Sequence, residues 1–126
     1  MSNAYDTSVY TSGRAPDGER RLDLLSVVAP VYNEEGTLET FYARVCDALE
    51  GLRFELVLVD DGSSDASPAL LESLAAEDPR VHVVYLSRNF GHQTALTAGL
   101  DHARGSAVVM LDADLQDPPE LIPRML

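Results

Sequence analysis

Two aspartates and a glutamine follow an apolar run near the end of the chain, in the sequence MLDADLQDPPE at residues 110–120. Two carboxylates two residues apart, Asp112 and Asp114, can converge on one hard cation as the chain leaves a strand, and Gln116 can add a carbonyl oxygen. The alternative is that Asp112 caps a turn and Asp114 is solvated. The position directly after a buried strand favours a site for Mg²⁺ or Mn²⁺, which suit oxygen ligands.

The other acidic side chains of this stretch have a structural explanation. Asp117 precedes Pro118, which is the pattern of an N-cap followed by proline in the first turn of a helix. Glu120 would then lie in the first helical turn, where the helix dipole favours a negative charge. We therefore interpret the stretch as a metal site followed by a helix start.

Asp60 and Asp61 end another apolar run and precede Gly-Ser-Ser. Aspartates in this position commonly form turns through side-chain hydrogen bonds. One of the two carboxylates could instead point into a cleft and accept hydrogen bonds from a nucleobase or a ribose. The residues alone favour neither interpretation, whereas Ser63, Ser64 and Asp65 are interpreted as helix-entry residues.

A third cluster, Pro-Val-Tyr-Asn-Glu at residues 30–34, follows the first apolar run. Proline cannot donate to a sheet ladder, so Pro30 suits the exit of a strand, where the backbone can lie against a flat ring. Tyr32 could stack on a base, and Glu34 could accept hydrogen bonds from base or sugar. Alternatively, Tyr32 is a partly buried aromatic residue and Glu34 is an acidic residue near a helix N-terminus.

The basic residues offer fewer candidates. Arg88 is placed at the end of a strand, where it could pair with a phosphate in bidentate fashion or be a solvated surface residue. His92 is explained by helix capping or partial burial, and His82 and His102 are interpreted as structural or solvated. The sequence contains no Cys and His residues at the spacing of zinc ligands, and neither Gly-x-Ser-x-Gly nor Gly-x-Gly-x-x-Gly.

Composition narrows the function classes. The chain has 126 residues and a formal net charge of -12, and all nine of its basic residues are arginines. An acidic chain matches nucleic acid and anionic lipid poorly, and the lack of lysine excludes mechanisms that need one from this chain. The single cysteine, Cys46, excludes an internal disulfide and is interpreted as a core thiol in a reducing compartment. No run reaches the ~20 apolar residues of a membrane-spanning helix, so we expect one soluble, cytoplasmic domain.

Apolar patterns predict strands and helices that alternate between these clusters. Continuous apolar runs predict strands at 24–30, 54–60, 81–86 and 106–112. Three- and four-residue spacing and capping signals, including Ser67 as an N-cap, predict helices at about 36–51, 67–76 and 92–103 and the start of another at 118. Residues 1–22 lack apolar periodicity and predict a disordered leader before a domain at 23–126.

The alternation of strand and helix predicts a mostly parallel α/β sheet with helices on both faces. In such sheets ligands bind beyond the carboxyl ends of the strands. Each cluster described above lies at such an end, so neighbouring first and fourth strands would place all of them around one cleft. The last predicted helix has no C-cap and no closing strand follows it, so we expect the chain to be a fragment of a longer protein, with a truncated fold.

Four segments in this order and at these intervals closely resemble glycosyltransferase family 2. They are VVAPVYNEE (27–35), VDDGSSD (59–65), SRNFG (87–91) and MLDADLQDPPE (110–120). Within the family, the chain is most similar to the polyprenyl-phosphate glycosyltransferases related to dolichol-phosphate mannosyltransferase, over about residues 24–126. Each motif alone is a weak signal, but the four in order are a strong one.

The resemblance implies a GT-A type α/β fold that binds a nucleotide-diphospho-sugar, and it prefers Asp61 to Asp60 as the base contact. The residues that would line the nucleotide are Pro30, Tyr32, Glu34, Val59 and Asp61. Those that would hold the metal and the pyrophosphate are Asp112, Ala113, Asp114 and Gln116. We add Arg88 to the nucleotide-binding set as the phosphate partner, and we expect Asp112 and Asp114 to be the catalytic residues.

The resemblance also implies inverting transfer of a hexose from a nucleotide diphosphate to a dolichyl or undecaprenyl phosphate, on the cytoplasmic side of a membrane. A divalent cation at Asp112 and Asp114 would stabilise the charge on the leaving diphosphate. A phosphate acceptor, with a second pKa of about 6, is mostly ionised at neutral pH and needs no general base. We expect the nucleotide-sugar donor and the lipid phosphate as partners and no nucleic acid, and we leave open a homo-oligomer of the full-length form.

Three alternatives stay open. A family 2 transferase acting on a saccharide hydroxyl would differ in its acceptor region, which is absent from this chain together with the membrane helices that many relatives carry. A phospho-receiver module also has a parallel sheet and an acidic pair, but the pair here follows the second predicted strand and the lysine of such modules is missing. The third alternative is an inactive remnant that binds nucleotide.

Overall fold

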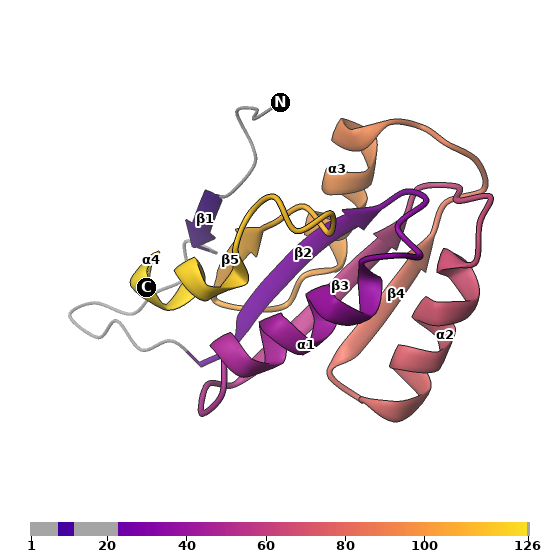
Figure 1. Ribbon diagram of the computed structural model, residues 1–126. Helices are drawn as coiled ribbons and strands as arrows, with labels where there is room; N and C mark the ends of the chain where they lie inside the picture. The colour runs from indigo at the N-terminus through magenta and orange to yellow at the C-terminus, as the bar shows by residue number, and fades with distance from the viewer. Residues whose placement is uncertain (1–7, 12–22, 126) are drawn as a thin grey trace.

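The computed structural model describes residues 8–11 and 23–125 (Figure 1). In these residues the sheet has the strand order β1-β5-β2-β3-β4. Its strands are β1 (Ser8–Thr11), β2 (Leu25–Val31), β3 (Phe54–Asp60), β4 (Val81–Tyr85) and β5 (Ala107–Met110). The helices are α1 (Leu38–Ala48), α2 (Ser67–Glu77), α3 (His92–His102), the 3-10 turn η1 (Pro119–Leu121) and α4 (Ile122–Met125). None of the helices in the described residues has both the length and the apolar character that crossing a membrane requires.

The four strands that the sequence predicts are parallel to one another. β2 pairs with β3 and with β5, and β3 pairs with β4. The predicted ends of these strands agree with the structure to within two residues, because each strand is a mostly apolar run. β2 and β3 lie in the middle of the sheet and are almost entirely buried, as expected for parallel strands covered on both faces.

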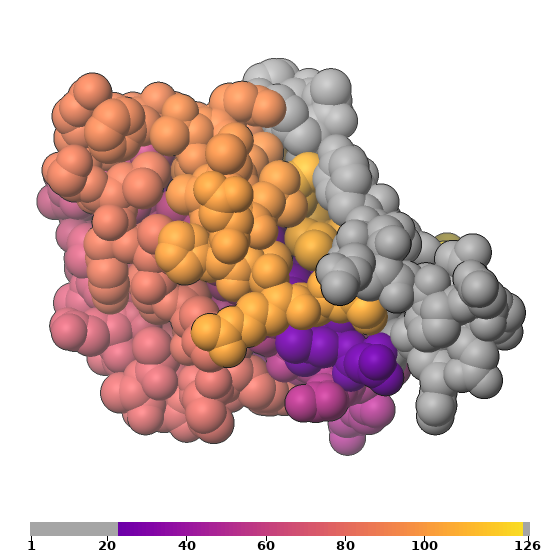
Figure 2. All heavy atoms as spheres, turned by 180° about the vertical axis from the view of Figure 1, so that it is seen from behind, coloured from indigo at the N-terminus to yellow at the C-terminus, as the bar shows by residue number. Residues whose placement is uncertain are grey.

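Alternate side chains of the central strands face two separate hydrophobic cores. On one face, Leu56 belongs to a cluster with Phe41 of α1 and Leu71 of α2. On the other face, Val57 belongs to a cluster with Leu96 of α3. Figure 1 shows α1 and α2 in front of the sheet and α3 behind it. In Figure 2, the same molecule seen from behind, α3 and the chain that leads to β5, in orange, form much of the surface. The prediction of helices on both faces is confirmed.

β1 departs from the sequence prediction. A disordered leader was expected over residues 1–22, but Ser8–Thr11 form a strand that pairs antiparallel with β5. Without this partner, the edge of β5 would present a row of unpaired N–H and C=O groups, and the pairing satisfies them. The rest of the predicted leader lies outside the described residues.

Two predicted helix caps are wrong. α2 begins at Ser67 itself, whose N–H donates to Asp65 Oδ1 (2.9 Å), while the Ser67 hydroxyl accepts the N–H of Glu34 (2.9 Å). Asp117 does not cap a helix either, because η1 has no side-chain cap and Asp117 Oδ2 lies 3.4 Å from the N–H of Asp112. Ser67 instead binds a backbone group of the loop after β2, and Asp117 binds one of its own loop after β5; both loops form the site described below.

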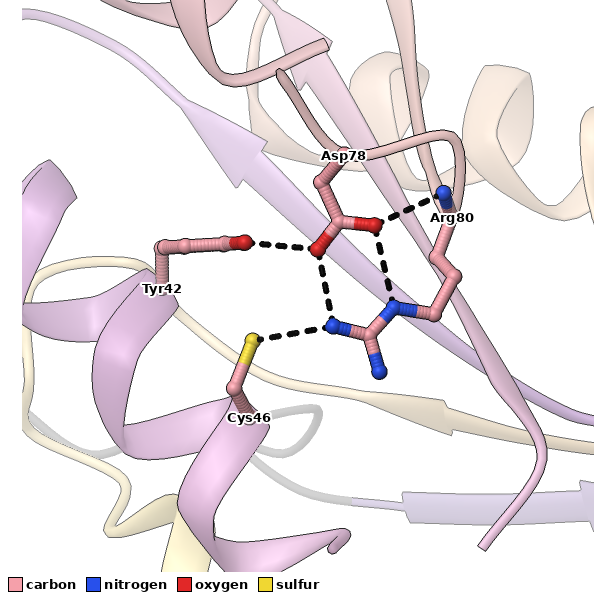
Figure 3. A network of polar contacts seen from close by, with 4 residues as sticks. All are labelled: Tyr42, Cys46, Asp78 and Arg80. Atoms are coloured by element: carbon pink, nitrogen blue, oxygen red, sulfur yellow. Dashed lines mark hydrogen bonds and ion pairs between the residues drawn. The ribbon is translucent and has the colours of Figure 1, made fainter.

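A charged cluster joins α1 to the connection between α2 and β4 (Figure 3). The Tyr42 hydroxyl donates to Asp78 Oδ2 at 2.6 Å, and Arg80 donates to both oxygens of the same carboxylate, at 3.0 and 2.8 Å. The Arg80 guanidinium holds the pKa of Asp78 well below its usual range, and the bond to Asp78 raises the pKa of Tyr42. The thiol of Cys46 is partly buried and accepts from Arg80, so it belongs to this cluster as well as to the core margin.

Candidate functional site

The loops that follow β2, β3, β4 and β5 surround one cleft. β5 lies next to β2, so the first and fourth predicted strands are neighbours, which is the condition that the one-cleft prediction requires. The cleft has a volume of about 490 Å³ and draws residues from all four motif segments. It is lined by Pro30, Tyr32, Glu34, Asp61, Asn89, Gly91, His92, Asp112, Ala113, Asp114 and Gln116.

The loop after β5 carries the predicted metal ligands into the cleft. Asp114 Oδ1 accepts the N–H of Gln116 at 3.1 Å, which fixes the turn between them. Leu115, inside this turn, has a φ of 70°, a left-handed conformation that is uncommon for residues other than glycine and that concentrates at functional sites. With this turn in place, Asp112, Asp114 and Gln116 all line the same cleft.

Two side chains hold this loop from outside the cleft. The hydroxyl of Thr37, at the start of α1, lies 3.1 Å from the carbonyl oxygen of Ala113 and 3.0 Å from Glu34 Oε1. Asp117 is buried, and its Oδ2 accepts the N–H of Asp112 at 3.4 Å. Asp117 therefore anchors the backbone that carries the two predicted metal ligands, and the Thr37 hydroxyl lies within hydrogen-bond distance of this backbone on the other side.

Asp61 is buried at the end of β3 and organises the loop after β4. Its Oδ1 accepts the N–H of Phe90 at 2.8 Å, and its Oδ2 accepts the N–H of Gly91 at 3.1 Å and lies 3.3 Å from the side-chain nitrogen of Asn89. Asp61 lines the cleft, whereas Asp60, which is also buried, does not. The structure thus places at the cleft the aspartate that the family resemblance prefers.

Gly62 brings the turn after β3 against the same loop. Its φ is 73°, and a Cβ atom at this position would lie 2.4 Å from backbone atoms of both Arg88 and Asn89. Both the conformation and the close approach of two backbones require glycine here. The contact fixes the loop that carries Asn89 and Gly91 next to Asp61.

The loop after β2 is locked to the loop after β3 through Asn33. Asn33 has a φ of 53°, and its Oδ1 accepts the N–H groups of Ser64 (2.8 Å) and Asp65 (3.3 Å). Its own N–H donates to Ser63 Oγ at 2.9 Å. The serines and the aspartate that the sequence predicts at the entry to a helix therefore also position the loop that carries Glu34.

Glu34 is partly buried at the cleft, and its pKa differs from that of an exposed carboxyl. Burial raises the pKa of Glu34, the hydrogen bond with Thr37 lowers it, and the nearby charges of Asp114 and Asp65 raise it, so that the pKa lies above its ordinary value. The charged form of Glu34 is thus disfavoured by the fold. A ligand that donates hydrogen bonds to its carboxylate would relieve part of this cost.

Pro30 and Tyr32 give the cleft its flat apolar surfaces. Pro30 lies near the end of β2, and the Tyr32 side chain, at the rim, is 47% exposed. Tyr32 is therefore exposed over about half of its surface, and its stacking on a base stays a prediction.

Val59 and Arg88 do not line the cleft. Val59 is fully buried in the core beneath α3. Arg88 is exposed, and its guanidinium carbon lies 4.0 Å above the ring of Phe90. Neither residue lines the cleft with the other predicted site residues, although Val59 pairs with Pro30 in the sheet.

The sequence analysis does not assign three residues of the cleft to the site: Asn89, Gly91 and His92. His92 is the first residue of α3, and its Nε2 lies 3.5 Å from Asp112 Oδ1. The signal that could have found these residues is their place directly after a predicted strand, at the edge of the sheet where the other clusters lie. Their approach to the cleft depends on the hydrogen bonds of Asp61, which local spacing does not reveal.

The lining of the cleft is strongly acidic. The carboxylates of Glu34, Asp61, Asp112 and Asp114 line it, and no arginine does among the residues described. The same residues contain no group of three or more His, Cys, Asp and Glu side chains arranged to hold a metal. Two carboxylates and the amide of Gln116 fit Mg²⁺ or Mn²⁺ instead, because such ions bind through one or two carboxylates and take further oxygens from substrate phosphates.

Residues 26–126 match the family model described as Glycosyl transferase family 2. The chain is 50% identical over 103 residues to the uncharacterized glycosyltransferase YkcC of Bacillus subtilis, covering 80% of this chain and 32% of that protein. It is 47% identical over 111 residues to the undecaprenyl-phosphate 4-deoxy-4-formamido-L-arabinose transferase of Shewanella sediminis (85% and 33%). It is 45% identical over 104 residues to the bactoprenol glucosyl transferase of Shigella phage SfX (81% and 34%). The chain spans about a third of the length of these relatives.

Solved structures share the fold. The mannosyltransferase PcManGT from Pyrobaculum calidifontis, in complex with GDP-Man and Mn²⁺, has a TM-score of 0.67 and 29% identity, covering 82% of this chain and 35% of that one. Staphylococcus aureus TarS, in complex with UDP-GlcNAc, has a TM-score of 0.63 and 28% identity, covering 71% and 26%. The parallel strands and their helices thus form a fold of the GT-A type, as expected.

Proposed function

Because the chain belongs to glycosyl transferase family 2, we propose that the protein transfers a hexose from a nucleotide-diphospho-sugar to a polyprenyl phosphate, with inversion and with Mg²⁺ or Mn²⁺. The observation that carries this proposal is the single cleft. It joins hydrogen-bond acceptors suited to a nucleoside with oxygen ligands suited to a divalent cation. The acceptor class follows from relatives whose names specify undecaprenyl phosphate and bactoprenol.

The nucleoside is held by the loops after β2 and β3. The exposed ring of Tyr32 and the flat side of Pro30 contact the base, and Glu34 accepts from base or ribose. Asp61 contributes in two ways. Its carboxylate fixes the loop after β4, and Oδ1, which accepts one N–H, retains a lone pair that can accept from the ligand.

The diphosphate is held at the other half of the cleft. Asp112, Asp114 and Gln116 are the residues that would bind the cation, which when bound supplies positive charge to the leaving diphosphate. α3 begins at His92, at the cleft, and no side chain of the described residues caps it. The positive end of the α3 dipole therefore also favours an anion here.

The transfer itself needs little proton chemistry. An oxygen of the acceptor phosphate attacks the anomeric carbon on the face opposite the nucleotide, and the bond to the diphosphate breaks with its electron pair leaving on the phosphate oxygen. An acceptor phosphate is mostly ionised at neutral pH, so no general base is required. Because the acceptor is a membrane lipid, we propose that the whole protein works at the cytoplasmic face of a membrane.

Calorimetry tests the donor site. UDP-sugars and GDP-sugars are titrated into the 126-residue chain with and without Mn²⁺. We expect Mn²⁺ to strengthen binding and Asp114→Ala to weaken binding in its presence at least about tenfold, since metal-site substitutions typically have effects of that order. Asp101→Ala, which removes an exposed carboxylate on α3, is the matched control and should change affinity less than about twofold. An affinity that does not change with Mn²⁺, or an unchanged affinity in Asp114→Ala, would contradict the site assignment.

Product analysis tests the acceptor and the stereochemistry. The full-length protein is incubated with nucleotide sugar and either undecaprenyl phosphate or free saccharides. We expect a glycolipid phosphate whose anomeric configuration, measured by NMR, is opposite to that of the donor. A product formed only on a saccharide hydroxyl would show that the acceptor is a saccharide and not a lipid phosphate. Retention of configuration would contradict the direct displacement.

A further inference from the structure

Thr37 occupies the N-cap position of α1 but does not cap that helix. A threonine at this position ordinarily accepts an N–H from the first helical turn. No such bond is made by the Thr37 side chain. Its hydroxyl oxygen lies instead 3.0 Å from Glu34 Oε1 and 3.1 Å from the carbonyl oxygen of Ala113. The hydroxyl thus lies between the loop after β2 and the loop after β5.

A hydroxyl group has one proton, and both of these neighbours are acceptors. Thr37 can therefore donate to Glu34 or to Ala113, but not to both at the same time. The two distances are nearly equal, so geometry favours neither partner. In the absence of ligand, the ionised carboxylate of Glu34 is the stronger acceptor, because hydrogen bonds to charged groups are stronger than those to neutral carbonyls.

The rest of the local framework is fixed, so the choice of partner requires only a rotation of the hydroxyl. Further along α1, Arg44 donates to both oxygens of Glu120, at 2.8 and 2.6 Å, and this pair joins α1 to η1. Asp117 holds the other side of the loop through the N–H of Asp112. The helix that carries Thr37 and the loop that carries Ala113 are therefore held next to one another by other contacts.

We propose that Thr37 is a positioning residue that couples the nucleotide half of the cleft to its metal half. The inference rests on the proposed function. When a base or sugar donates to Glu34, the carboxylate becomes a weaker acceptor for Thr37, and the hydroxyl turns to the carbonyl of Ala113. That bond adds a second restraint, beside that of Asp117, on the backbone between Asp112 and Asp114, the residues that would bind the cation. By reciprocity, the cation strengthens nucleotide binding by the same factor.

A set of three threonine variants tests this coupling. Thr37→Val keeps the shape of the side chain and removes its hydroxyl, and Thr37→Ser keeps the hydroxyl. Thr40→Val is the matched control, because Thr40 is exposed on the same helix. The dissociation constant for Mn²⁺ is measured by electron paramagnetic resonance, without nucleotide and with saturating UDP or GDP. The ratio of the two constants is the coupling factor.

We expect Thr37→Val to reduce the coupling factor about fivefold, which corresponds to the loss of about one hydrogen bond. Its Mn²⁺ affinity without nucleotide should stay within about twofold of the native value, because the hydroxyl then faces Glu34. Thr37→Ser and Thr40→Val should keep the native coupling factor. An unchanged factor in Thr37→Val, or an equal weakening with and without nucleotide, would overturn the proposal.

A measurement on the native chain does not depend on how the variants fold. The carbonyl carbon of Ala113 reports its hydrogen bonding by its NMR shift, and this shift should move when UDP or GDP is added without metal. A static shift in the nucleotide-bound chain would overturn the role of Thr37 and leave the proposed function intact. A native chain that bound no nucleotide even with Mn²⁺ would contradict the proposed function, and the coupling would fail with it.

Discussion

Replacing Asp61 with asparagine tests whether one buried carboxylate builds the cleft. In the native chain, Oδ1 accepts the N–H of Phe90, and Oδ2 accepts the N–H of Gly91 and faces the side-chain nitrogen of Asn89. Asparagine keeps one of these oxygens and places an NH₂ group at the other position. Because donors face both positions, one hydrogen bond becomes a contact between two donors.

The size of the effect follows from these contacts. A hydrogen bond to a charged group contributes about 1.5–3 kcal/mol and a neutral one about 1 kcal/mol. Asp61→Asn loses one of the first kind and weakens the others, so we expect the free energy of unfolding to fall by about 2–4 kcal/mol. For a domain of this size the melting temperature should fall by about 8–15 °C. Asp101→Asn, at an exposed position of α3, should change the free energy by less than about 0.5 kcal/mol.

Urea denaturation of the native chain and both variants measures the free energy, and amide hydrogen exchange locates the change. We expect the amides of Phe90 and Gly91 to exchange faster in Asp61→Asn, because their acceptor is lost or weakened. An Asp61→Asn chain that is as stable as the native one, with unchanged exchange at both amides, would refute the conclusion that this carboxylate holds the loop.

Three further changes test separate parts of the fold. Gly51 and Gly62 both have positive φ, but of the two only Gly62 faces backbone atoms. In urea denaturation, Gly51→Ala should lower the free energy of unfolding by about 1 kcal/mol and Gly62→Ala by about 3 kcal/mol or more. Equal losses would contradict the close approach of the two backbones at Gly62. Because the pKa of Glu34 is raised, its contribution to stability is present below pH 4.5 and is lost as the pH rises through the raised value. Glu34→Gln resembles the protonated form at every pH. In thermal melts, this variant should therefore gain stability relative to the native chain as the pH rises from about 4 to about 7. A difference that does not vary with pH would contradict that shift. Tyr42→Phe removes a hydrogen bond to the buried carboxylate of Asp78, and its unfolding free energy should be about 1–2 kcal/mol lower, whereas no measurable loss would show that the bond is dispensable.

The strands could be predicted because their signal is local. The run at 54–60 is apolar except for Glu55 and its final residue, and β3 has these limits in the structure. The pairing of β5 with β2 could not be predicted, since chain order does not specify which strands pair. From the sequence, one cleft could be predicted only on the condition that these two strands are neighbours. The pairing of Val28 with Met110 meets that condition. β1 was missed because four polar and apolar residues alone carry too weak a pattern to predict a strand.

The candidate site was predictable to the extent that its residues belong to motifs. Asp112, Asp114 and Glu34 line the cleft at the ends of the predicted strands. The placement of His92 was not predictable, because it depends on hydrogen bonds between Asp61 and the loop after β4. These bonds join residues about 30 positions apart, and no local pattern encodes them.

The failure of the helix-cap predictions has the same physical origin. Asp117 followed by proline is a sound local signal for a cap, but a side chain can satisfy only a few donors. The left-handed turn at Leu115 returns the chain so that the N–H of Asp112 lies near the Asp117 carboxylate. A loop that must present two aspartates to a cleft thus takes over an acceptor that the following helix would otherwise use.

The distribution of charge in the cleft explains how an acidic chain could bind an acidic ligand. The negative charge of Asp61 is stabilised by backbone N–H groups, and burial disfavours the charged form of Glu34. The nucleoside half of the cleft is therefore less repulsive to a nucleotide than its count of carboxylates suggests. At the other half, Asp112 and Asp114 stand two residues apart on a loop that Asp117 anchors. Repulsion between these carboxylates and a diphosphate is offset only by positive charge, so the affinity for nucleotide sugars should depend on the divalent cation far more than the affinity for the nucleoside alone.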